Sequence, residues 1–470
     1  MPKLPFRRRV VRSRRHPGMT GWTASAPAFL LAAILLSGCE LVARDEAAEV
    51  DSRLEEALLA ASRTGDLSYY ILPESDDFRS IPQDPANPLT LAKVELGRLL
   101  FHDSGLAVDP RRPEQRGRWS CASCHHARAG FQAGVRQGIG EGGVGFGVHG
   151  EARVTATDFA DEELDVQPIR SPSIMNSAYQ EAQLWNGQFG ASGVNADTRH
   201  RWTPGSPKEV NYLGFEGVET QSIAGLGVHR MGSLSTSILA TDPIYRALWD
   251  EVFAGVTPNP IEAGLAIAAY ERTVLSNRAP FQRWLRGERK AMSVEEKEGA
   301  LLFFGKAKCD ACHSGPAMNS MTFHALGMAD LAGPDVRFDP RDLPKPRGRG
   351  AFTLDPEDAY GFKTPQLYNL EDAVFLGHGA SFSSIRAVIE YKNRAIPEVA
   401  LLSDVLSPLF IPLGLTEDEV DVLTAFVAGA LRDPDLRRYE PSHVPSGSCI
   451  PMNDPVSRID LGCDAAVAIR

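Results

Sequence analysis

The sequence predicts an all-α protein made of two similar helical domains joined by long loops. Apolar residues recur at helical spacing in several segments, and two of these segments begin with a capping signal. No segment shows the strict apolar–polar alternation of a half-buried strand. An apolar segment followed by the motif Cys-x-x-Cys-His occurs twice, which indicates an internal duplication. These three observations favour two helical units over a sheet-based fold.

Length and composition agree with this class. The chain has 470 residues, which exceeds the roughly 250–300 residues at which a single core stops growing, so two domains are expected. Its 42 glycines and 33 prolines predict many loops between modest helices. The formal net charge of −11 argues against a nucleic-acid partner.

The first residues predict an export signal. Residues 1–38 contain seven basic residues and no acidic one, and their apolar run at 28–36 is too short for a membrane span of ~20 residues. The run ends in Leu36-Ser37-Gly38-Cys39, a pattern that resembles a bacterial lipobox. We therefore expect a lipoprotein signal peptide over 1–38 and a lipid anchor on Cys39 that holds the protein on the periplasmic side of a membrane. The outer membrane is favoured, because Glu40 is not the Asp usually associated with inner-membrane retention.

Several segments after the signal are predicted to be helical. Residues 39–87 are expected to form a tether that includes a short amphipathic helix with Val50, Leu54 and Leu58 on one face. A helix at 95–101 precedes the first Cys-x-x-Cys-His motif, and its counterpart at 298–303 precedes the second. Residues 259–286 are predicted as one helix that begins at Pro260.

Two capping boxes and two loops complete the outline. Ser293 with Glu296, and Thr416 with Glu419, have the spacing with which a helix begins. The domain boundary is placed near Gly287. Residues 136–168 and 330–358 are rich in glycine, proline and charged residues and are predicted to be long loops.

The repeated motif determines the cofactor class. In Cys-x-x-Cys-His the two thiols can add to the two vinyl groups of a haem while the adjacent histidine binds the iron. One zinc ion bound by both cysteine pairs is the alternative, which the long gap between the pairs, the histidine after each pair and the predicted export all disfavour. We therefore predict two covalently bound c-type haems, one at each motif. The attachment residues are Cys121, Cys124, Cys309 and Cys312, and the iron ligands are His125 and His313.

Two cysteines remain in the tail. Cys449 and Cys463 are expected to form a disulfide in an exported protein, with two free thiols as the alternative.

An ordered set of further motifs resembles the bacterial di-haem cytochrome c peroxidase family, which includes the MauG enzymes. The resemblance covers roughly residues 88–445. It rests on Leu96-Gly97-Arg98-Leu99-Leu100-Phe101, on Ser171-Pro172-Ser173-Ile174-Met175-Asn176 with Leu184-Trp185-Asn186-Gly187, and on Phe362-Lys363-Thr364-Pro365-Gln366-Leu367 with His378.

The resemblance implies two cytochrome c-like helical domains, each with one covalently bound c-type haem and each haem with its own role. Residues 88–287 would carry the peroxidatic haem on His125, residues 288–445 the electron-transfer haem on His313, and residues 446–470 would form a tail. The implied reaction is the reduction of hydrogen peroxide to water, with electrons from a small donor protein such as a cytochrome c or a cupredoxin.

The proton-transfer residues depart from the family pattern. Cleavage of peroxide needs a group that moves a proton between the two oxygens. The family uses a Gln and a Glu, of which Gln221 matches the first, whereas Arg230 stands in the place of the second. His229 or Glu219 is therefore expected to take the role of the missing acid. His149, in a glycine-rich stretch, is a candidate for a loop ligand that leaves on activation.

The second haem and its surroundings also depart from the pattern. The position of the axial ligand, Met in peroxidases and Tyr in MauG, falls on Lys392, which we predict as a metal ligand, with Met318, Met321 or Met328 as alternatives. The calcium ligand between the haems falls on Arg170, so calcium is not favoured there. The Trp that the family places between the haems has no counterpart in residues 126–169, which leaves Phe146 and Trp185 as alternatives.

Two other functions stay open at this point. One is a MauG-like di-haem oxidase that acts on a protein or organic substrate, and the other is a non-catalytic electron-transfer cytochrome. Whether the chain forms a homodimer is also open.

Overall fold

The computed structural model describes residues 47–338, 348–401 and 404–464. Every strand within these ranges is only two residues long: β1 (Gly143–Val144), β2 (Val154–Thr155), β3 (Phe323–His324) and β4 (Phe362–Lys363). Strand β1 pairs antiparallel with β2, and β3 with β4. The all-α prediction is therefore confirmed in its coarser form, a mostly helical fold with few and short strands in the described ranges.

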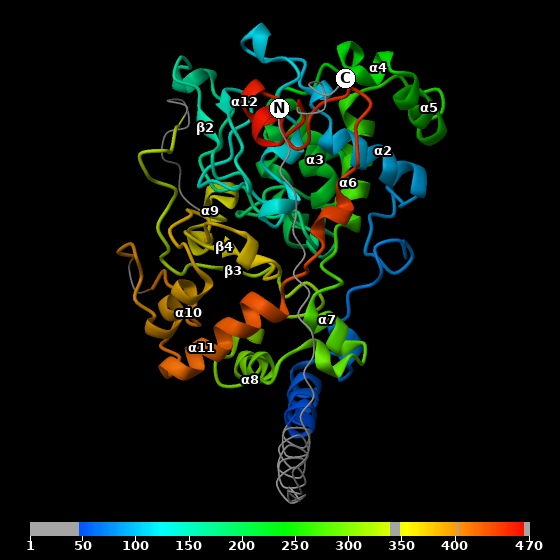
Figure 1. Ribbon diagram of the computed structural model, residues 1–470. Coiled ribbons are helices and arrows are strands. Elements are labelled where there is room, and N and C mark those ends of the chain that lie inside the picture. The colour runs from blue at the N-terminus through cyan, green and yellow to red at the C-terminus, as the bar shows by residue number, and fades with distance from the viewer. Residues whose placement is uncertain (1–46, 339–347, 402–403, 465–470) are drawn as a thin grey trace, which may run out of the picture. The chain divides into compact units, whose positions relative to one another are not determined.

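The helices fall into two groups along the chain. In Figure 1, α2, α3, α4, α5 and α6 lie toward the top of the view, and α8, α10 and α11 lie toward the bottom. Short 3-10 turns join many of them. The α-helices are α2 (Leu91–His102), α3 (Gly217–Val228), α4 (Ile238–Thr241), α5 (Pro243–Val252), α6 (Pro260–Thr273), α7 (Pro280–Leu285), α8 (Val294–Phe303), α9 (Gly350–Thr353), α10 (Ile385–Arg394), α11 (Glu417–Ala425) and α12 (Pro455–Asp460).

The predicted capping boxes start two of these helices. Ser293 accepts a hydrogen bond from the backbone N–H of Glu296 at 3.1 Å, and the Glu296 carboxylate accepts from the N–H of Ser293 at 2.7 Å. Thr416 and Glu419 form the same reciprocal pair at the start of α11. Both pairs satisfy N–H groups that a helix leaves unpaired at its first turn.

The single helix predicted over 259–286 is wrong, because the chain forms α6 and α7 with a break between them. The N–H groups of Leu275 and Ser276 bond to Tyr439 Oη at 3.1 Å and to Asn176 Oδ1 at 3.0 Å. Pro280 then begins α7 without an N–H to continue the ladder. Tertiary hydrogen bonds that are invisible to local periodicity therefore end α6.

The two halves repeat one packing arrangement, as the predicted duplication requires. Gly97 on α2 lies so close to α6 that an added Cβ would stand 1.8 Å from the carbonyl oxygen of Ala266. Gly299 on α8 lies equally close to α11, where a Cβ would stand 2.0 Å from the carbonyl oxygen of Val422. A glycine thus allows each motif-bearing helix to approach its partner closely.

The segment predicted as a tether is folded from Val50 onward. Residues 47–61 are helical, as expected, and Leu54 and Leu58 are completely buried in the main hydrophobic core. Asp51 accepts a hydrogen bond from Trp284 Nε1 at 2.6 Å and forms an ion pair with Lys297 at 2.7 Å. The body of the protein therefore begins near Val50 and not at residue 88.

The predicted signal peptide and Cys39 lie outside the described residues. Among the helices of the described ranges, none combines the length and the apolar character that crossing a membrane requires.

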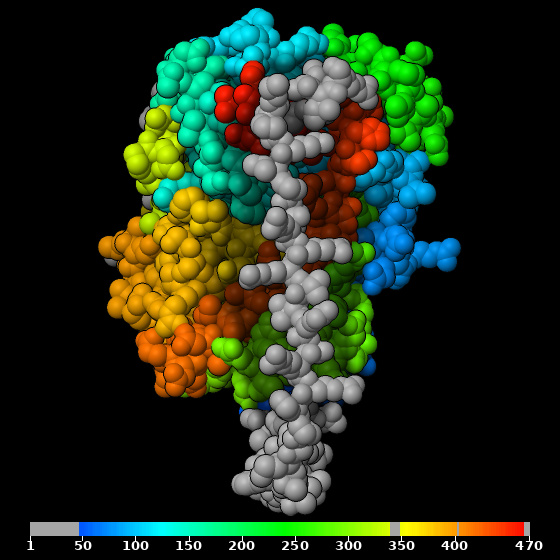
Figure 2. Space-filling view, viewed as in Figure 1, coloured from blue at the N-terminus to red at the C-terminus, as the bar shows by residue number. Residues whose placement is uncertain are grey.

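The C-terminal tail returns to the first half of the molecule. The predicted disulfide between Cys449 and Cys463 is present. Asp454 forms a fully buried ion pair with Arg153 at 3.1 Å, and the carbonyl of Pro451 accepts a hydrogen bond from Ser123 Oγ at 3.1 Å. In Figures 1 and 2 the red C-terminal residues accordingly lie among the cyan and teal residues of the first half. The tail thus packs directly against the first Cys-x-x-Cys-His motif.

Candidate active site

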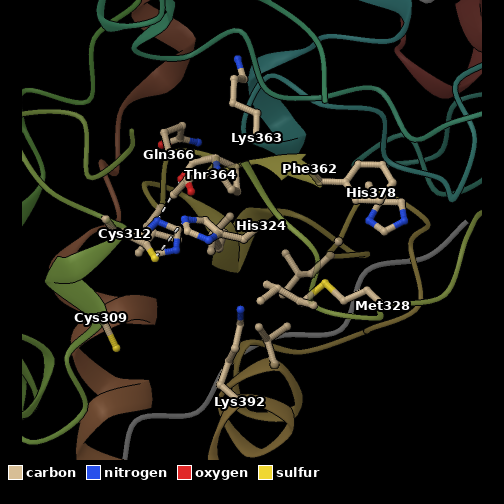
Figure 3. Close-up of a pocket in the computed structure, with 18 of the residues that line it drawn as sticks. Cys309, Cys312, His324, Met328, Phe362, Lys363, Thr364, Gln366, His378 and Lys392 are labelled. Carbon is tan, nitrogen blue, oxygen red and sulfur yellow. Dashed lines mark hydrogen bonds between the residues drawn. The ribbon is translucent and has the colours of Figure 1, made fainter. Parts of the chain in front are cut away.

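A cavity of about 410 Å³ lies beside the second Cys-x-x-Cys-His motif. Figure 3 shows Cys309 and Cys312 on one wall, with β3, β4 and α10 around the space. Most of the other lining side chains are apolar, among them Phe303, Leu326, Met328, Ile385, Val388, Ile389, Phe410 and Leu423. Burial raises the pKa of both thiols, to about 12 for Cys309, so both are neutral.

Both motif histidines are held as neutral iron ligands would be. His313 Nδ1 lies 3.0 Å from the carbonyl oxygen of Pro365 and 3.2 Å from that of Met318, and His125 Nδ1 lies 3.3 Å from that of Phe131. Carbonyl oxygens only accept, so each Nδ1 carries the proton and each Nε2 keeps a free lone pair. Burial lowers the pKa of each histidine to about 4, which keeps the rings uncharged.

Lys392 extends from α10 into the cavity. Figure 3 shows its Nζ directed toward Cys312 and His324. Burial lowers its pKa to about 8, and within the described ranges no carboxylate forms an ion pair with it. Its neighbour Tyr391 instead packs on Phe410 and donates a hydrogen bond to the carbonyl oxygen of Leu326. Of the two adjacent residues, Lys392 alone lines the cavity.

Methionine and histidine side chains occupy other parts of this wall. Met328 lines the cavity, whereas Met318 is completely buried. His324 Nδ1 contacts Ser407 Oγ at 3.1 Å. The ring of His378 stacks on Phe362 with centroids 3.6 Å apart.

Two buried cations line the same cavity. Lys363 Nζ donates to Gln180 Oε1 and to the carbonyl oxygen of Ala182, and burial lowers its pKa to about 7. Arg170 is fully buried, its terminal nitrogens donate to the carbonyls of Val135 and Ala133, and its Nε has no partner. Within the described ranges neither cation is paired with a carboxylate, although an unpaired buried charge is costly.

These residues fit a haem. The cavity offers two thiols at the attachment spacing, a neutral histidine with a free Nε2, apolar walls and two cations that have no counter-ion among the described residues. A haem has an apolar ring, which can pack against the apolar walls, and two carboxylates, which can pair with the two cations. Among the described residues, no group of three or more His, Cys, Asp or Glu side chains is placed to hold a bare metal ion.

The first motif is enclosed by the 136–168 loop. Burial raises the pKa of Cys121, and raises that of Cys124 to about 12. An added Cβ at Gly138 would lie 2.9 Å from Cys124 Sγ, so the loop passes directly over this thiol. Only a residue without a side chain fits at that point.

The three predicted proton-transfer residues lie on or next to α3, with different surroundings. Glu219 is fully buried and accepts hydrogen bonds at 2.8 and 2.6 Å from Arg272, so it forms a structural ion pair. Gln221 is half-buried. His229 contacts both carboxylate oxygens of Asp165 from Nδ1 at 3.0 Å, and its positive charge helps to lower the pKa of His125. The geometry thus favours His229 over Glu219.

The remaining candidates divide between the two motifs. His149 is exposed on the loop, where its Nδ1 lies 3.3 Å from the carbonyl oxygen of Arg128. Phe146 packs edge-on against His126, next to the first motif. Trp185 lines the second cavity and contacts the ring of His378 edge-on.

Sequence reasoning missed several residues around both motifs. Asp165 ends an acidic run that was read as loop, and no spacing rule connects it with His229, 64 positions away. Lys363 belongs to the motif at 362–367, but its place in the same cavity wall as Arg170 depends on tertiary structure.

Comparisons with known proteins agree with this geometry. A family model described as di-haem cytochrome c peroxidase matches residues 91–290. The cytochrome-c peroxidase IdrP1 of Denitromonas iodatirespirans is 29% identical over 390 residues, which cover 78% of this chain and 88% of that protein. The methylamine utilization protein MauG of Methylorubrum extorquens is 29% identical over 358 residues, which cover 76% and 82%.

One solved structure shows the shared fold. The crystal structure of a MauG-like protein associated with microbial copper homeostasis aligns with a TM-score of 0.52 at 22% identity and covers 78% of this chain and 95% of that one.

Proposed function

The chain belongs to the di-haem cytochrome c peroxidase family, and on that premise we propose that it reduces hydrogen peroxide to water with electrons from a small periplasmic redox protein. Family membership implies two c-type haems. The observation that carries the proposal is the pair of buried motifs in which His125 and His313 each have a protonated Nδ1 and a free Nε2.

The four motif cysteines and the two motif histidines hold the cofactors. Cys121 and Cys124 would form thioethers at the first site, and Cys309 and Cys312 at the second. Nε2 of His125 and of His313 would bind the iron. When bound, the haem groups supply the two electrons that break the O–O bond of peroxide.

The protein's own task at the first site is to move protons. His229 is the proposed proton carrier, since it lies near His125 and is partly accessible. Gln221, on the preceding turns of α3, is the second polar group proposed to contact peroxide. Glu219 does not take part, because Arg272 binds both of its oxygens.

At the second site Lys392 is the proposed sixth ligand of the iron. Its amine extends into the cavity from the side of α10, and a pKa of about 8 makes the neutral, ligating form accessible near neutral pH. Met328 is the alternative ligand on the same cavity wall.

The proposal includes the location of the protein. Export by residues 1–38 and lipid attachment at Cys39 would hold the folded body at the periplasmic face of a bacterial membrane, with the outer membrane favoured. Replacing Cys39 with Ser should then release the haem-loaded chain from the membrane fraction of cells that mature c-type haem.

A MauG-like oxidase is the second candidate function. It is favoured by one observation, the presence of Lys392 where a peroxidase would carry an axial methionine. Such an enzyme would oxidise a protein or organic substrate instead of a small electron donor.

A steady-state assay separates the two candidates. The haem-loaded full chain is mixed with peroxide and either a reduced cytochrome c or a reduced cupredoxin, and donor oxidation is followed by absorption. A peroxidase oxidises at least one donor with two electrons consumed per peroxide, and His125→Gly abolishes this reaction. Peroxide consumption without oxidation of either donor would instead support the oxidase.

A further inference from the structure

We infer that Asp165 and His229 form a proton-transfer dyad at the first site, with His229 as the catalytic residue and Asp165 as the residue that positions it. The inference deepens the proposed peroxidase function and rests on it. It begins from the contact of His229 Nδ1 with both carboxylate oxygens of buried Asp165 at 3.0 Å.

The backbone fixes both partners. His229 ends α3, its N–H donates to the carbonyl of Gly225 at 2.9 Å, and its carbonyl accepts from Trp119 Nε1 at 3.0 Å. Asp165 donates its N–H to the carbonyl of Glu141 at 3.0 Å, and its own carbonyl accepts from Gly140 at 2.9 Å. The dyad is therefore held between a helix end and two hydrogen-bonded loop segments.

The next residue explains why the dyad replaces a carboxylate at the end of α3. Arg230 has a φ of 59°, in the left-handed region, which turns its side chain toward the same loop. Its guanidinium pairs with buried Glu141 and donates to the carbonyls of Glu163 and Leu164. Two consecutive side chains thus bind two acidic residues of one loop, and His229 is the more accessible of the two, with 34% of its side chain exposed against 15% for Arg230.

The dyad has the chemistry that proton transfer needs. A carboxylate can only accept, so Asp165 fixes the Nδ1–H tautomer of the neutral ring and leaves the Nε2 lone pair free. Among the described residues, Nε2 has no hydrogen-bond partner. Burial alone would lower the pKa of His229, but the charge of Asp165 and its hydrogen bond outweigh burial and the opposing charge of Arg230, and raise that pKa above 6.5.

The proton step balances within the substrate. Nε2 accepts the proton of one peroxide oxygen and donates it to the other, which leaves as water when the O–O bond breaks. The haems would supply the two electrons for this cleavage, and the remaining oxygen would take two protons from solvent and leave as a second water. Through its contact with Nδ1, Asp165 stabilises the imidazolium that forms in between. No other acid or base of the chain is needed for this transfer.

Binding of hydrogen cyanide tests the dyad without turnover. Hydrogen cyanide must lose its proton to bind iron as cyanide, so its binding needs a base, and stopped-flow absorption of the haem-loaded chain measures the rate. General-base assistance contributes about 100-fold or more. His229→Gln and Asp165→Asn should therefore each slow binding by about that factor, and the matched loop substitution Glu162→Gln should leave the rate within twofold of wild type.

Two further measurements keep the result unambiguous. In a His229→Gly variant, added imidazole should restore the cyanide binding rate, which a merely structural role of His229 would not allow. Nitrogen NMR should show a protonated Nδ1 on His229 that is lost or shifted in Asp165→Asn.

If the wild-type chain oxidises its donor with peroxide while Asp165→Asn and His229→Gln bind cyanide at the wild-type rate, the dyad is wrong and the peroxidase function stands. A wild-type chain that is inert to both peroxide and cyanide would overturn both.

Discussion

Trp185 donates a hydrogen bond from its indole Nε1 to the backbone carbonyl of Arg170 at 2.9 Å. The carbonyl of Trp185 in turn accepts from the N–H of Lys363 at 2.8 Å. The two cations without carboxylate partners are thus connected through one tryptophan, in the wall of the cavity beside His313. This wall is where we expect the carboxylates of a haem.

Replacing Lys363 with Met should lower the reduction potential of the haem at His313. A cation near the iron destabilises the more positive oxidised state, so its removal favours oxidation. A loss of about 1 kcal/mol corresponds to a decrease of about 40 mV for a one-electron couple. Spectroelectrochemical titration of the haem-loaded protein measures this change. Arg278→Gln, which replaces an exposed, ion-paired arginine, is the control. If the haem at His313 has the same reduction potential in Lys363→Met as in this control, Lys363 does not have the assigned role.

Replacing Lys392 with Ala should change the spectrum of the second haem. Loss of a nitrogen ligand opens or exchanges the sixth coordination position of the iron. EPR and absorption spectra of the oxidised protein should therefore show a new species in Lys392→Ala but not in Lys306→Ala, which removes a surface lysine paired with Glu419. An unchanged spectrum in Lys392→Ala, with a change in Met328→Ala, would identify Met328 as the ligand.

Glu271 should make stability depend on pH. Burial and the neighbouring charge of Glu219 raise its pKa to about 8. The folded state therefore holds a proton that the unfolded state has released, and the free energy of unfolding falls as pH rises from about 4.5 to about 8. Glu271→Gln should remove this component, of the order of a few kcal/mol, in denaturant titrations at pH 5 and pH 8.5. Equal pH slopes in Glu271→Gln and wild type would show that Glu271 is ionised in the folded protein.

Removing the tail disulfide should loosen the packing of the C-terminal tail against the first Cys-x-x-Cys-His motif. A crosslink of this loop length, with a sequence separation of 14, stabilises by about 3 kcal/mol. Replacing both Cys449 and Cys463 with Ser should lower the free energy of unfolding by about 2–3 kcal/mol and make the tail sensitive to protease. Wild type treated with a reductant should behave in the same way, and an unaffected variant would show that the contacts of Asp454 suffice.

The sequence predicted those features that local rules determine. The two Cys-x-x-Cys-His motifs, the capping boxes of Ser293 and Thr416, and the pairing of Cys449 with Cys463 each depend on residue types at short or characteristic spacings. His229 was found because α3 resembles a family segment.

The features that sequence reasoning missed depend on tertiary contacts. The break after α6 results from bonds to Asn176 and Tyr439, residues about 100 or more positions away. Asp165 meets His229 only because the 136–168 loop folds over the first motif. The tether was predicted too long because Leu54 and Leu58 are buried against the body. An amphipathic pattern predicts a helix but does not show what its apolar face packs against.

The most direct test of the central claim is a titration of the fully reduced, haem-loaded chain with hydrogen peroxide, followed by absorption. One equivalent of peroxide should oxidise both haems, and in His125→Gly the haem at His313 should stay reduced. A wild-type protein whose two haems both remain reduced in excess peroxide would contradict the assignment of this chain as a peroxidase.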